Sequence, residues 1–300
     1  MSSNQPLVDV INSLIEKDPD MSVFSLYQIL KNKNIAMEEP SPSQMLACLS
    51  IKAKDALIQS DAILPSVQSY PQLIPTGRYQ YINTICSIDH FKYVSQYARE
   101  FFSISDKAPL CAVLSTDSAS YFQDIIRSIC SKVLSLIPQG HLLPSISVIG
   151  SRCFLRRTYP LNHGQFSGNI NNQNWHQDSN PMFGSMPMAT IWIPLDKGCG
   201  CDCPGLDISS INVNTFISRL GDGCDTLQKD ELTEFGSSDH QDVCSLECNT
   251  LDGIVFNGLT FHRTSYHEGM NKSRDVLIIR IAPTDLINHF PGNRDYDFSL

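Results

Sequence analysis

The sequence predicts an α+β protein in which helices come first and antiparallel strands follow. Up to about residue 140, apolar residues recur at the three- and four-residue spacing of amphipathic helices. Beyond that point, short runs rich in β-branched residues alternate with turns that contain Gly, Pro and Asn. We therefore expect one domain over residues 1–300, with a mainly helical layer over 1–140 and a sandwich or jelly roll over 141–300.

Five apolar stripes predict five helices in the first part of the chain. They cover residues 7–15, 22–30, 43–60, a segment that begins after Asp89, and 118–137. Pro138-Gln139-Gly140 is a suitable end for the fifth helix. In the second part, strands are expected at residues 146–149, 153–159, 188–195, 206–213, 254–256 and 276–281. Asn257-Gly258 has the composition of a hairpin turn.

The composition restricts the classes of partner. The chain carries 22 Lys and Arg against 31 Asp and Glu, a net charge of −9, and 42% of its residues are hydrophobic. This charge disfavours nucleic acid as a partner, because phosphates would be repelled. No apolar run approaches the ~18 residues of a membrane span, and the N-terminus lacks the pattern of a signal peptide. We expect a cytoplasmic protein that binds neither nucleic acid nor membrane.

Cysteine is abundant, and its distribution favours reduced thiols. The 11 cysteines are odd in number and mostly scattered singly, which is unlike a disulfide framework. The exception is Cys199-Gly200-Cys201-Asp202-Cys203. One interpretation is a structural zinc site completed by later cysteines, and the other is a Gly- and Pro-containing turn that is rich in Cys. Adjacent C-x-C ligands on one ion are strained, which favours the turn.

Two H-x-D triplets are candidates for a metal site. His240-Gln241-Asp242 lies in a polar, acidic stretch without a strand pattern, so we interpret it as a solvated loop. His176-Gln177-Asp178 instead leads into a strongly predicted strand over 190–195. Residues i and i+2 of a strand share a face, so the imidazole of His176 and the carboxylate of Asp178 could bind one ion.

His262 is the candidate for the third ligand. It follows a predicted turn, buried strand, tight turn and strand, which could present it beside the first pair in a folded-over antiparallel sheet. Two imidazoles and one carboxylate leave three adjacent coordination positions open, as in the facial triad of non-haem Fe(II) oxygenases. A zinc hydrolase can use the same ligands, so the ligand types alone do not identify the metal.

Arginines on the last predicted strand add a second feature. Alternation puts Arg274 and Arg280 on the same face of this strand. If this face points inward, Arg274 can hold the distal carboxylate of a dicarboxylate, with a hydroxyl donor from Thr264. The alternative is that both arginines face solvent, because a buried guanidinium without an anion is costly. On an earlier strand, at most one of Arg156 and Arg157 points inward, where it could bind a substrate carboxylate.

Three segments together carry a family resemblance. They are Trp175-His176-Gln177-Asp178, Trp192-Ile193-Pro194-Leu195-Asp196 followed by Pro204-Gly205-Leu206, and residues 252–280. With them, residues 146–283 resemble Fe(II)- and 2-oxoglutarate-dependent dioxygenases of the phytanoyl-CoA dioxygenase-like (PhyH) family. The resemblance implies a double-stranded β-helix core, or jelly roll, with flanking helices. The turn at 199–203 is denser in Cys than is usual in this family, and residues 1–140 resemble no family.

The resemblance also implies roles for the candidate residues. His176, Asp178 and His262 match the iron ligands. Arg274 and Thr264 match the anchor of the 2-oxoglutarate C5 carboxylate, and Trp192 lies on the strand that places an indole near this cosubstrate, where core packing would explain it equally well. The implied reaction uses O2 to oxidise a C–H bond of a small molecule, by hydroxylation, desaturation or ring closure, and releases succinate and CO2.

Other functions stay open at this point. A non-catalytic jelly roll that binds metal and 2-oxoglutarate would have the same ligands, and a zinc-dependent hydrolase could share the triad. A protein-interaction module built on the cysteine cluster is a further alternative. A free amino acid or a secondary-metabolite intermediate is open as substrate, whereas the negative charge disfavours acyl-CoA.

Overall fold

The computed structural model describes residues 72–103, 111–113, 119–137, 145–160, 175–178, 187–213, 226–227, 243–287 and 298–300. All of them belong to one compact unit formed by residues 64–217 and 225–300. The helices expected at 7–15, 22–30 and 43–60 lie outside the described residues, and the single domain over 1–300 stays a prediction. Within the described segments, no helix is both long and apolar enough to span a membrane.

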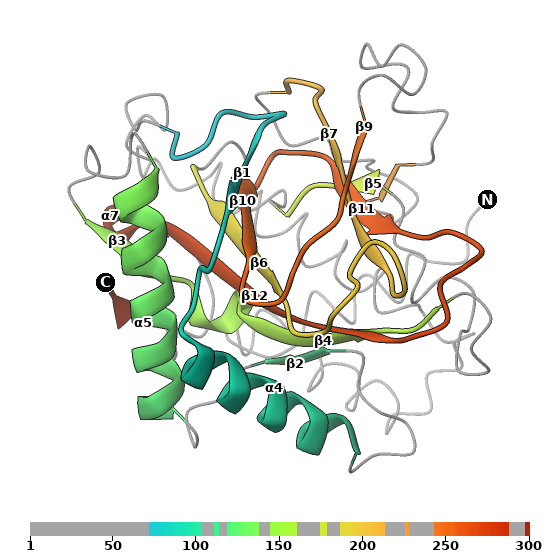
Figure 1. Cartoon of the computed structure of the whole chain (residues 1–300). Helices are drawn as coiled ribbons and strands as arrows, with labels where there is room; N and C mark the ends of the chain where they lie inside the picture. Colours follow the sequence, from blue (N-terminus) through green and yellow to red (C-terminus); the bar gives the residue numbers. More distant parts are fainter. Residues whose placement is uncertain are drawn as a thin grey trace, which may run out of the picture. The chain divides into compact units, whose positions relative to one another are not determined.

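Two antiparallel sheets form the core, and Figure 1 shows them facing each other. The larger sheet has the order β1-β10-β6-β12-β3-β13, and β4 pairs with β12 and with β2. Its strands are β1 (Tyr79–Ile82), β2 (Cys111–Val113), β3 (Ile146–Val148), β4 (Phe154–Thr158), β6 (Ala189–Pro194), β10 (Gly253–Asn257), β12 (Arg274–Pro283) and β13 (Phe298–Ser299).

The smaller sheet has the order β8-β5-β11-β7-β9. Its strands are β5 (Trp175–His176), β7 (Gly205–Ser209), β8 (Thr226–Leu227), β9 (Val243–Leu246) and β11 (His262–Ser265). Apolar side chains from both sheets meet between them, among them Trp192, Ile208 and Phe256. This arrangement is the double-stranded β-helix, so the predicted α+β class with a jelly-roll core is confirmed.

Two helices cover the outer face of the larger sheet (Figure 1). They are α4 (Ile88–Ser103) and α5 (Ala119–Leu136), which confirms the helices predicted after Asp89 and over 118–137. Ser87 caps α4, because its Oγ accepts a hydrogen bond from the N–H of His90 at 3.1 Å. The buried stripe of α5 includes Ile125 and Ile129, which pack in one cluster with Ile279 of β12. Short helices η4 (Gly150–Arg152) and α7 (Thr284–Ile287) flank the sheet.

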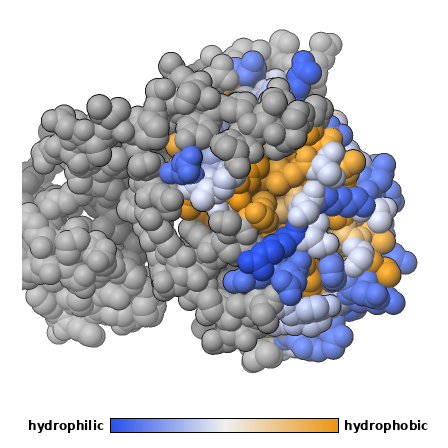
Figure 2. All heavy atoms as spheres, turned by 90° about the vertical axis from the view of Figure 1, so that its left-hand side faces the viewer, coloured by the Kyte–Doolittle hydropathy of each residue, from blue (hydrophilic) through white to orange (hydrophobic). Residues whose placement is uncertain are grey.

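The opposite sides of these two helices leave apolar groups near the surface. The side of the molecule that carries α5 shows apolar side chains gathered together, with polar ones around them (Figure 2). Ile88 and Tyr93 of α4 and Tyr121 and Leu136 of α5 are each more than a third exposed. Tyr93 and Tyr121 meet edge to face, with 4.5 Å between their ring centroids, which ties the two helices together.

Strand β12 divides its residues between the two faces of the larger sheet. Leu277, Ile279 and Ile281 point outward and pack in the cluster that contains α4 and α5. The residues that alternate with them, such as Val276 and Ile278, point into the space between the sheets. Arg274 and Arg280 share this inner face, and they are only 2% and 9% exposed. The alternative that both arginines face solvent is therefore wrong.

One expectation about the chain order needs correction, and one gains a detail. The mainly helical layer predicted over 1–140 also contains two short strands, β1 and β2, which join the larger sheet. Asn257-Gly258 is not a hairpin turn, because β10 before it and β11 after it belong to different sheets. The side chain of Asn257 instead accepts a hydrogen bond from the N–H of Leu259 at 2.8 Å and donates to the carbonyl of Ile74 at 2.9 Å. These bonds direct the chain across to the second sheet.

Candidate metal centre

Three predicted residues come together at one end of the smaller sheet. The ligand atoms of His176, Asp178 and His262 all lie within 4.8 Å of one another, and this is the one group of three or more His, Cys, Asp or Glu residues with such spacing in the described part of the chain. His262 of β11 pairs directly opposite His176 of β5, and their ring centroids are 4.2 Å apart. The pairing of two strands distant in sequence thus brings the two imidazoles together.

The middle residue of the triplet fastens this arrangement. Gln177 is buried, and its Nε2 donates a hydrogen bond to the carbonyl of Leu259 at 2.7 Å. Leu259 lies in the turn that leads into β11. This bond joins the segment of His176 and Asp178 to the segment of His262, so the relative position of the ligands does not depend on the strand pairing alone.

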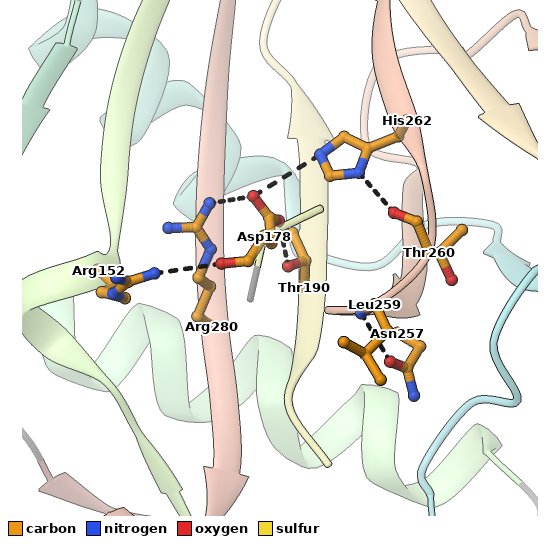
Figure 3. Close-up of polar contacts among 8 residues, drawn as sticks. All are labelled: Arg152, Asp178, Thr190, Asn257, Leu259, Thr260, His262 and Arg280. Atoms are coloured by element: carbon orange, nitrogen blue, oxygen red, sulfur yellow. Dashed lines mark hydrogen bonds and ion pairs between the residues drawn. The ribbon is translucent and has the colours of Figure 1, made fainter. Parts of the chain in front are cut away.

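His262 has a defined tautomer. Its Nδ1 lies 2.9 Å from the carbonyl oxygen of Thr260, which can only accept, so Nδ1 carries the hydrogen and Nε2 presents its lone pair (Figure 3). Burial lowers the pKa of His262 below its usual value, although the nearby charge of Asp178 opposes this effect. The imidazole is therefore neutral at neutral pH, the form that binds metal ions.

Both carboxylate oxygens of Asp178 have partners. The hydroxyl of Thr190 donates to Oδ2 at 2.5 Å, and Nη2 of Arg280 donates to Oδ1 (Figure 3). Burial acts to raise the pKa of Asp178, but the positive charge of Arg280, the two histidines and the bond from Thr190 outweigh it and hold the pKa well below the usual range. Asp178 is therefore ionised.

Arg274 lies deeper between the sheets. Its Nη1 donates to the carbonyls of Pro204 at 3.0 Å and Gly205 at 2.5 Å, and its Nη2 donates to the hydroxyl of Thr158 at 2.9 Å. All these acceptors are neutral. Nε has no partner, and no carboxylate contacts this guanidinium among the residues that the structure describes. A buried guanidinium without a carboxylate in contact is an unusual and costly feature.

The other two predicted cosubstrate residues also lie inside. Trp192 is buried in the core between the sheets, with the guanidinium of Arg274 at 5.0 Å from its ring centroid, so packing and a cation–π contact coexist. Thr264 shares the inner face of β11 with His262 and pairs with Leu206 of β7. The hydroxyl that contacts Arg274 is that of Thr158, which the sequence did not single out. The roles of Arg274, Thr264 and Trp192 in binding a cosubstrate stay predictions.

The register of the smaller sheet sets the distance between Arg274 and the triad. Nη1 of Arg274 reaches the carbonyl of Gly205, and Gly205 pairs with Ser265 of β11. Ser265 and His262 are three positions apart along β11, which is about 10 Å at the rise of an antiparallel strand. The buried guanidinium and the three candidate ligands therefore lie along one inner surface, about one short ligand apart.

Arg156 and Arg157 point to opposite sides, as alternation predicts. Arg157 lies on the outer face and binds Asp275 with two hydrogen bonds of 2.7 Å, from Nε and Nη2. Arg156, which pairs with Val276, is on the inner face. Of the two, Arg156 alone is placed to contact a ligand between the sheets.

The Cys-rich segment forms a turn beside Arg274. The backbone of Cys199 forms isolated β-bridges with that of Cys203 and that of Cys248. The thiols of these three residues are buried in the core between the sheets, whereas Cys201 is exposed. Gly198 and Gly200 both have positive φ, at 76° and 88°, which a turn this tight requires. The described cysteines are free thiols. The interpretation of 199–203 as a turn is thereby supported. The two residues that follow the turn, Pro204 and Gly205, accept the hydrogen bonds of Arg274.

The fold and the His-Asp-His group agree with the resemblance found in the sequence. No protein-family model matches the sequence, and no curated protein matches it. Among solved structures, one similar fold is the non-heme alpha ketoglutarate dependent carbocyclase SnoK from nogalamycin biosynthesis, with 10% identity, coverage of 78% of this chain and 98% of that chain, and a TM-score of 0.49. EctD from S. alaskensis, with 2-oxoglutarate and 5-hydroxyectoine, has 13% identity, coverage of 75% and 82%, and a TM-score of 0.48.

Proposed function

We propose that this protein is a Fe(II)- and 2-oxoglutarate-dependent oxygenase of the phytanoyl-CoA dioxygenase-like (PhyH) family. In this proposal it oxidises a C–H bond of a small molecule with O2 and releases succinate and CO2. The observation that carries the proposal is the buried guanidinium of Arg274, which no carboxylate of the described residues contacts, on the same inner surface as His176, Asp178 and His262.

The donor set fits ferrous iron. Two imidazoles, one of them a neutral ring with a defined tautomer, and one ionised carboxylate form the facial arrangement that leaves adjacent positions for other ligands. His176, Asp178 and His262 would hold the ion, which when bound supplies the activation of O2 that these side chains cannot. The carboxylate of Asp178 would occupy the coordination position that a halide ion needs, so we propose that the protein does not halogenate its substrate.

Arg274 suits one end of a dicarboxylate. A carboxylate at its free Nε edge would form a charge-assisted pair and compensate the buried charge. The spacing of about 10 Å along β11 lets a short ligand held at Arg274 reach the triad with its other end. Trp192 limits the position of the guanidinium from one side. A zinc hydrolase has no use for such an anchor, which favours the oxygenase over it.

The apolar residues between the sheets serve the same chemistry. Leu206, Ile254 and Phe256 are almost fully buried there, and the ring centroid of Phe256 lies 4.6 Å from that of His262, where the ring would keep water from one side of the triad. Free thiols suit a reducing compartment, where iron stays ferrous, so we propose a cytoplasmic location. The proposed substrate is a small molecule, such as an amino acid or a secondary-metabolite intermediate.

An anaerobic titration tests the proposal. Metal-free protein is mixed with Fe(II) and then with 2-oxoglutarate, and the visible charge-transfer absorption of the chelate is recorded. We expect the band in the native protein and its loss in Asp178→Ala. Absence of the band at saturating Fe(II) and 2-oxoglutarate would refute the assignment.

Turnover is tested separately by succinate release in air. Candidate substrates are screened for succinate formed above the rate without substrate. A protein that develops the band but forms no succinate with any substrate would be the non-catalytic binding protein instead.

A further inference from the structure

Arg280 places a second buried guanidinium at the triad itself. It lies on the inner face of β12, six residues beyond Arg274, and its Nη2 donates to Oδ1 of Asp178 (Figure 3). The ring of Phe154 lies 5.2 Å from the guanidinium carbon, and Nε has no partner among the described residues. Arg280 is thus held close to the candidate ligands by one charged partner.

The oxygen that Arg280 holds is the one that an ion would need. Oδ1 of Asp178 lies 3.6 Å from Nε2 of His262, the atom that presents a lone pair. The other oxygen, Oδ2, points to the hydroxyl of Thr190 instead. An ion bound by His262 and Asp178 would therefore bind Oδ1, where the guanidinium lies.

The charges make this overlap a competition. In the metal-free protein, Arg280 compensates the charge of a carboxylate that is buried and would otherwise be costly. A divalent ion at the triad would bring two positive charges next to the guanidinium in a weakly screened interior, where like charges repel strongly. Oδ1 of Asp178 cannot bind the divalent ion and keep its short contact with the guanidinium of Arg280 at the same time.

We propose that Arg280 is a built-in counter-ion that exchanges with the divalent ion: it holds Oδ1 of Asp178 in the metal-free protein and leaves this oxygen when the ion binds. The exchange keeps the empty site folded and lowers its affinity for metal. The inference rests on the proposed function only in that the triad binds a divalent ion, and it requires neither cosubstrate nor turnover.

Calorimetric titration of metal-free protein with Mn(II), without 2-oxoglutarate, tests the exchange. Arg280→Met removes the competing charge, and we expect the Kd for Mn(II) to fall by about tenfold or more, because charge repulsion outweighs the loss of one hydrogen bond. Arg280→Lys keeps the charge and should stay close to the native Kd. Thr190→Val is the matched control, since it removes the neutral partner of Asp178 and should weaken binding by up to ~10-fold.

Thermal unfolding of the same proteins gives a second measurement. Metal-free Arg280→Met should melt at a lower temperature than the native protein, and saturating Mn(II) should raise its melting temperature more than it raises that of the native protein. Arg280→Gln, which keeps hydrogen-bond donors without the charge, replaces Arg280→Met if the latter does not fold, and the same tightening is expected.

Two results have different meanings. Mn(II) binding by a folded Arg280→Met or Arg280→Gln that is equal to or weaker than native binding would overturn the counter-ion exchange and leave the proposed function intact. Lack of Mn(II) binding by the native protein would overturn the triad as a metal site, and with it both proposals.

Discussion

Two neighbouring residues of β12 show how differently the two faces of the larger sheet treat charge. Asp275 points outward, where both its oxygens bind Arg157 at 2.7 Å. Arg274 points inward, where its partners are two carbonyls and one hydroxyl. The outer pair is satisfied within the protein, whereas no carboxylate contacts the guanidinium of Arg274 among the described residues. The difference teaches that the inner face leaves one guanidinium, that of Arg274, for the anion that we propose as its ligand, while Arg280 is paired with Asp178.

The apolar residues follow the same division. On the outer face, Leu277, Ile279 and Ile281 belong to the large cluster that includes α4 and α5. The inner face mixes apolar residues such as Val276 with the two arginines. The outer face therefore supplies most of the packing that stabilises the sheet, and the inner face supplies the site.

The largest expected effect is on turnover, and it should separate the inner carboxylate of Asp178 from the outer carboxylate of Asp275. Asp178→Ala removes an inner candidate ligand, and we expect succinate formation to fall by at least ~10³-fold, since iron would lose one of three ligands. Asp275→Asn changes an outer carboxylate of similar burial and should keep turnover within a few-fold. Coupled succinate assays on both variants measure this. Unchanged turnover in Asp178→Ala would end the triad assignment.

The second effect separates the two arginines. Arg274→Met should weaken 2-oxoglutarate binding to the metal-loaded protein by at least ~30-fold, because a buried charge pair with the ligand is lost. Its free energy of unfolding without ligand should stay the same or rise. Arg157→Met should leave 2-oxoglutarate binding unchanged and lose about 1–3 kcal/mol of stability. Calorimetry measures the 2-oxoglutarate affinity, and urea unfolding measures the stability. Equal losses of 2-oxoglutarate affinity in both variants would contradict the difference between the inner and the outer arginine.

The third effect concerns packing on the two faces. Ile279 is fully buried against the helices, and Ile279→Ala should cost about 2–5 kcal/mol of unfolding free energy. Its neighbour Ile278 points to the inner face and is only half-buried, so Ile278→Ala should lower the unfolding free energy by less. Urea unfolding of both variants is the measurement. A larger loss for Ile278→Ala would mean that the inner face carries the stability.

The smallest expected effect is a loss of stability at alkaline pH, to which one buried thiol on each face of the larger sheet contributes. Burial raises the pKa of Cys86, in the outer core, to about 11, and that of Cys248, in the inner core, to about 12. Both thiols ionise near their usual value of about 8.5 once unfolded. Their stabilising contribution is therefore complete below about pH 8.5 and is lost as pH rises through the folded pKa values.

Melting temperatures from pH 8 to 11 measure this decline. For each variant, the melting temperature is compared with its own value at pH 8. The melting temperatures of Cys86→Ala and of Cys248→Ala should each fall less steeply with pH than that of the native protein. A decline of the same steepness in both variants would show that other groups cause it.

The parts of the fold that local patterns determine could be predicted from the sequence. The apolar stripe of α5, the end of this helix before Pro138, and the inward direction of Arg274 and Arg280 all follow from periodicity. The placement of β1 and β2 could not be predicted in this way. They are short, and they become strands because longer strands, β10 and β4, offer free edges to them.

The candidate site was predictable in the three residues that come together but not in the contacts that hold them and Arg274. The spacing of His176 and Asp178, and a later strand with His262, were visible in the chain. That Thr158 rather than Thr264 would contact Arg274, and that Arg280 would reach Asp178, depends on which strands pair and how far each side chain extends. Such contacts between residues distant in sequence leave no local pattern.

The direct pairing of His262 with His176 has a consequence for the register of β11. Successive residues of a strand point to alternate sides, so a slip of one residue in the pairing of β11 with β5 would turn His262 out of the site and bring its neighbour in. The bond from Gln177 to the carbonyl of Leu259 holds the two segments against such a slip. The contact that positions the candidate ligands is thus also a lock on the strand register.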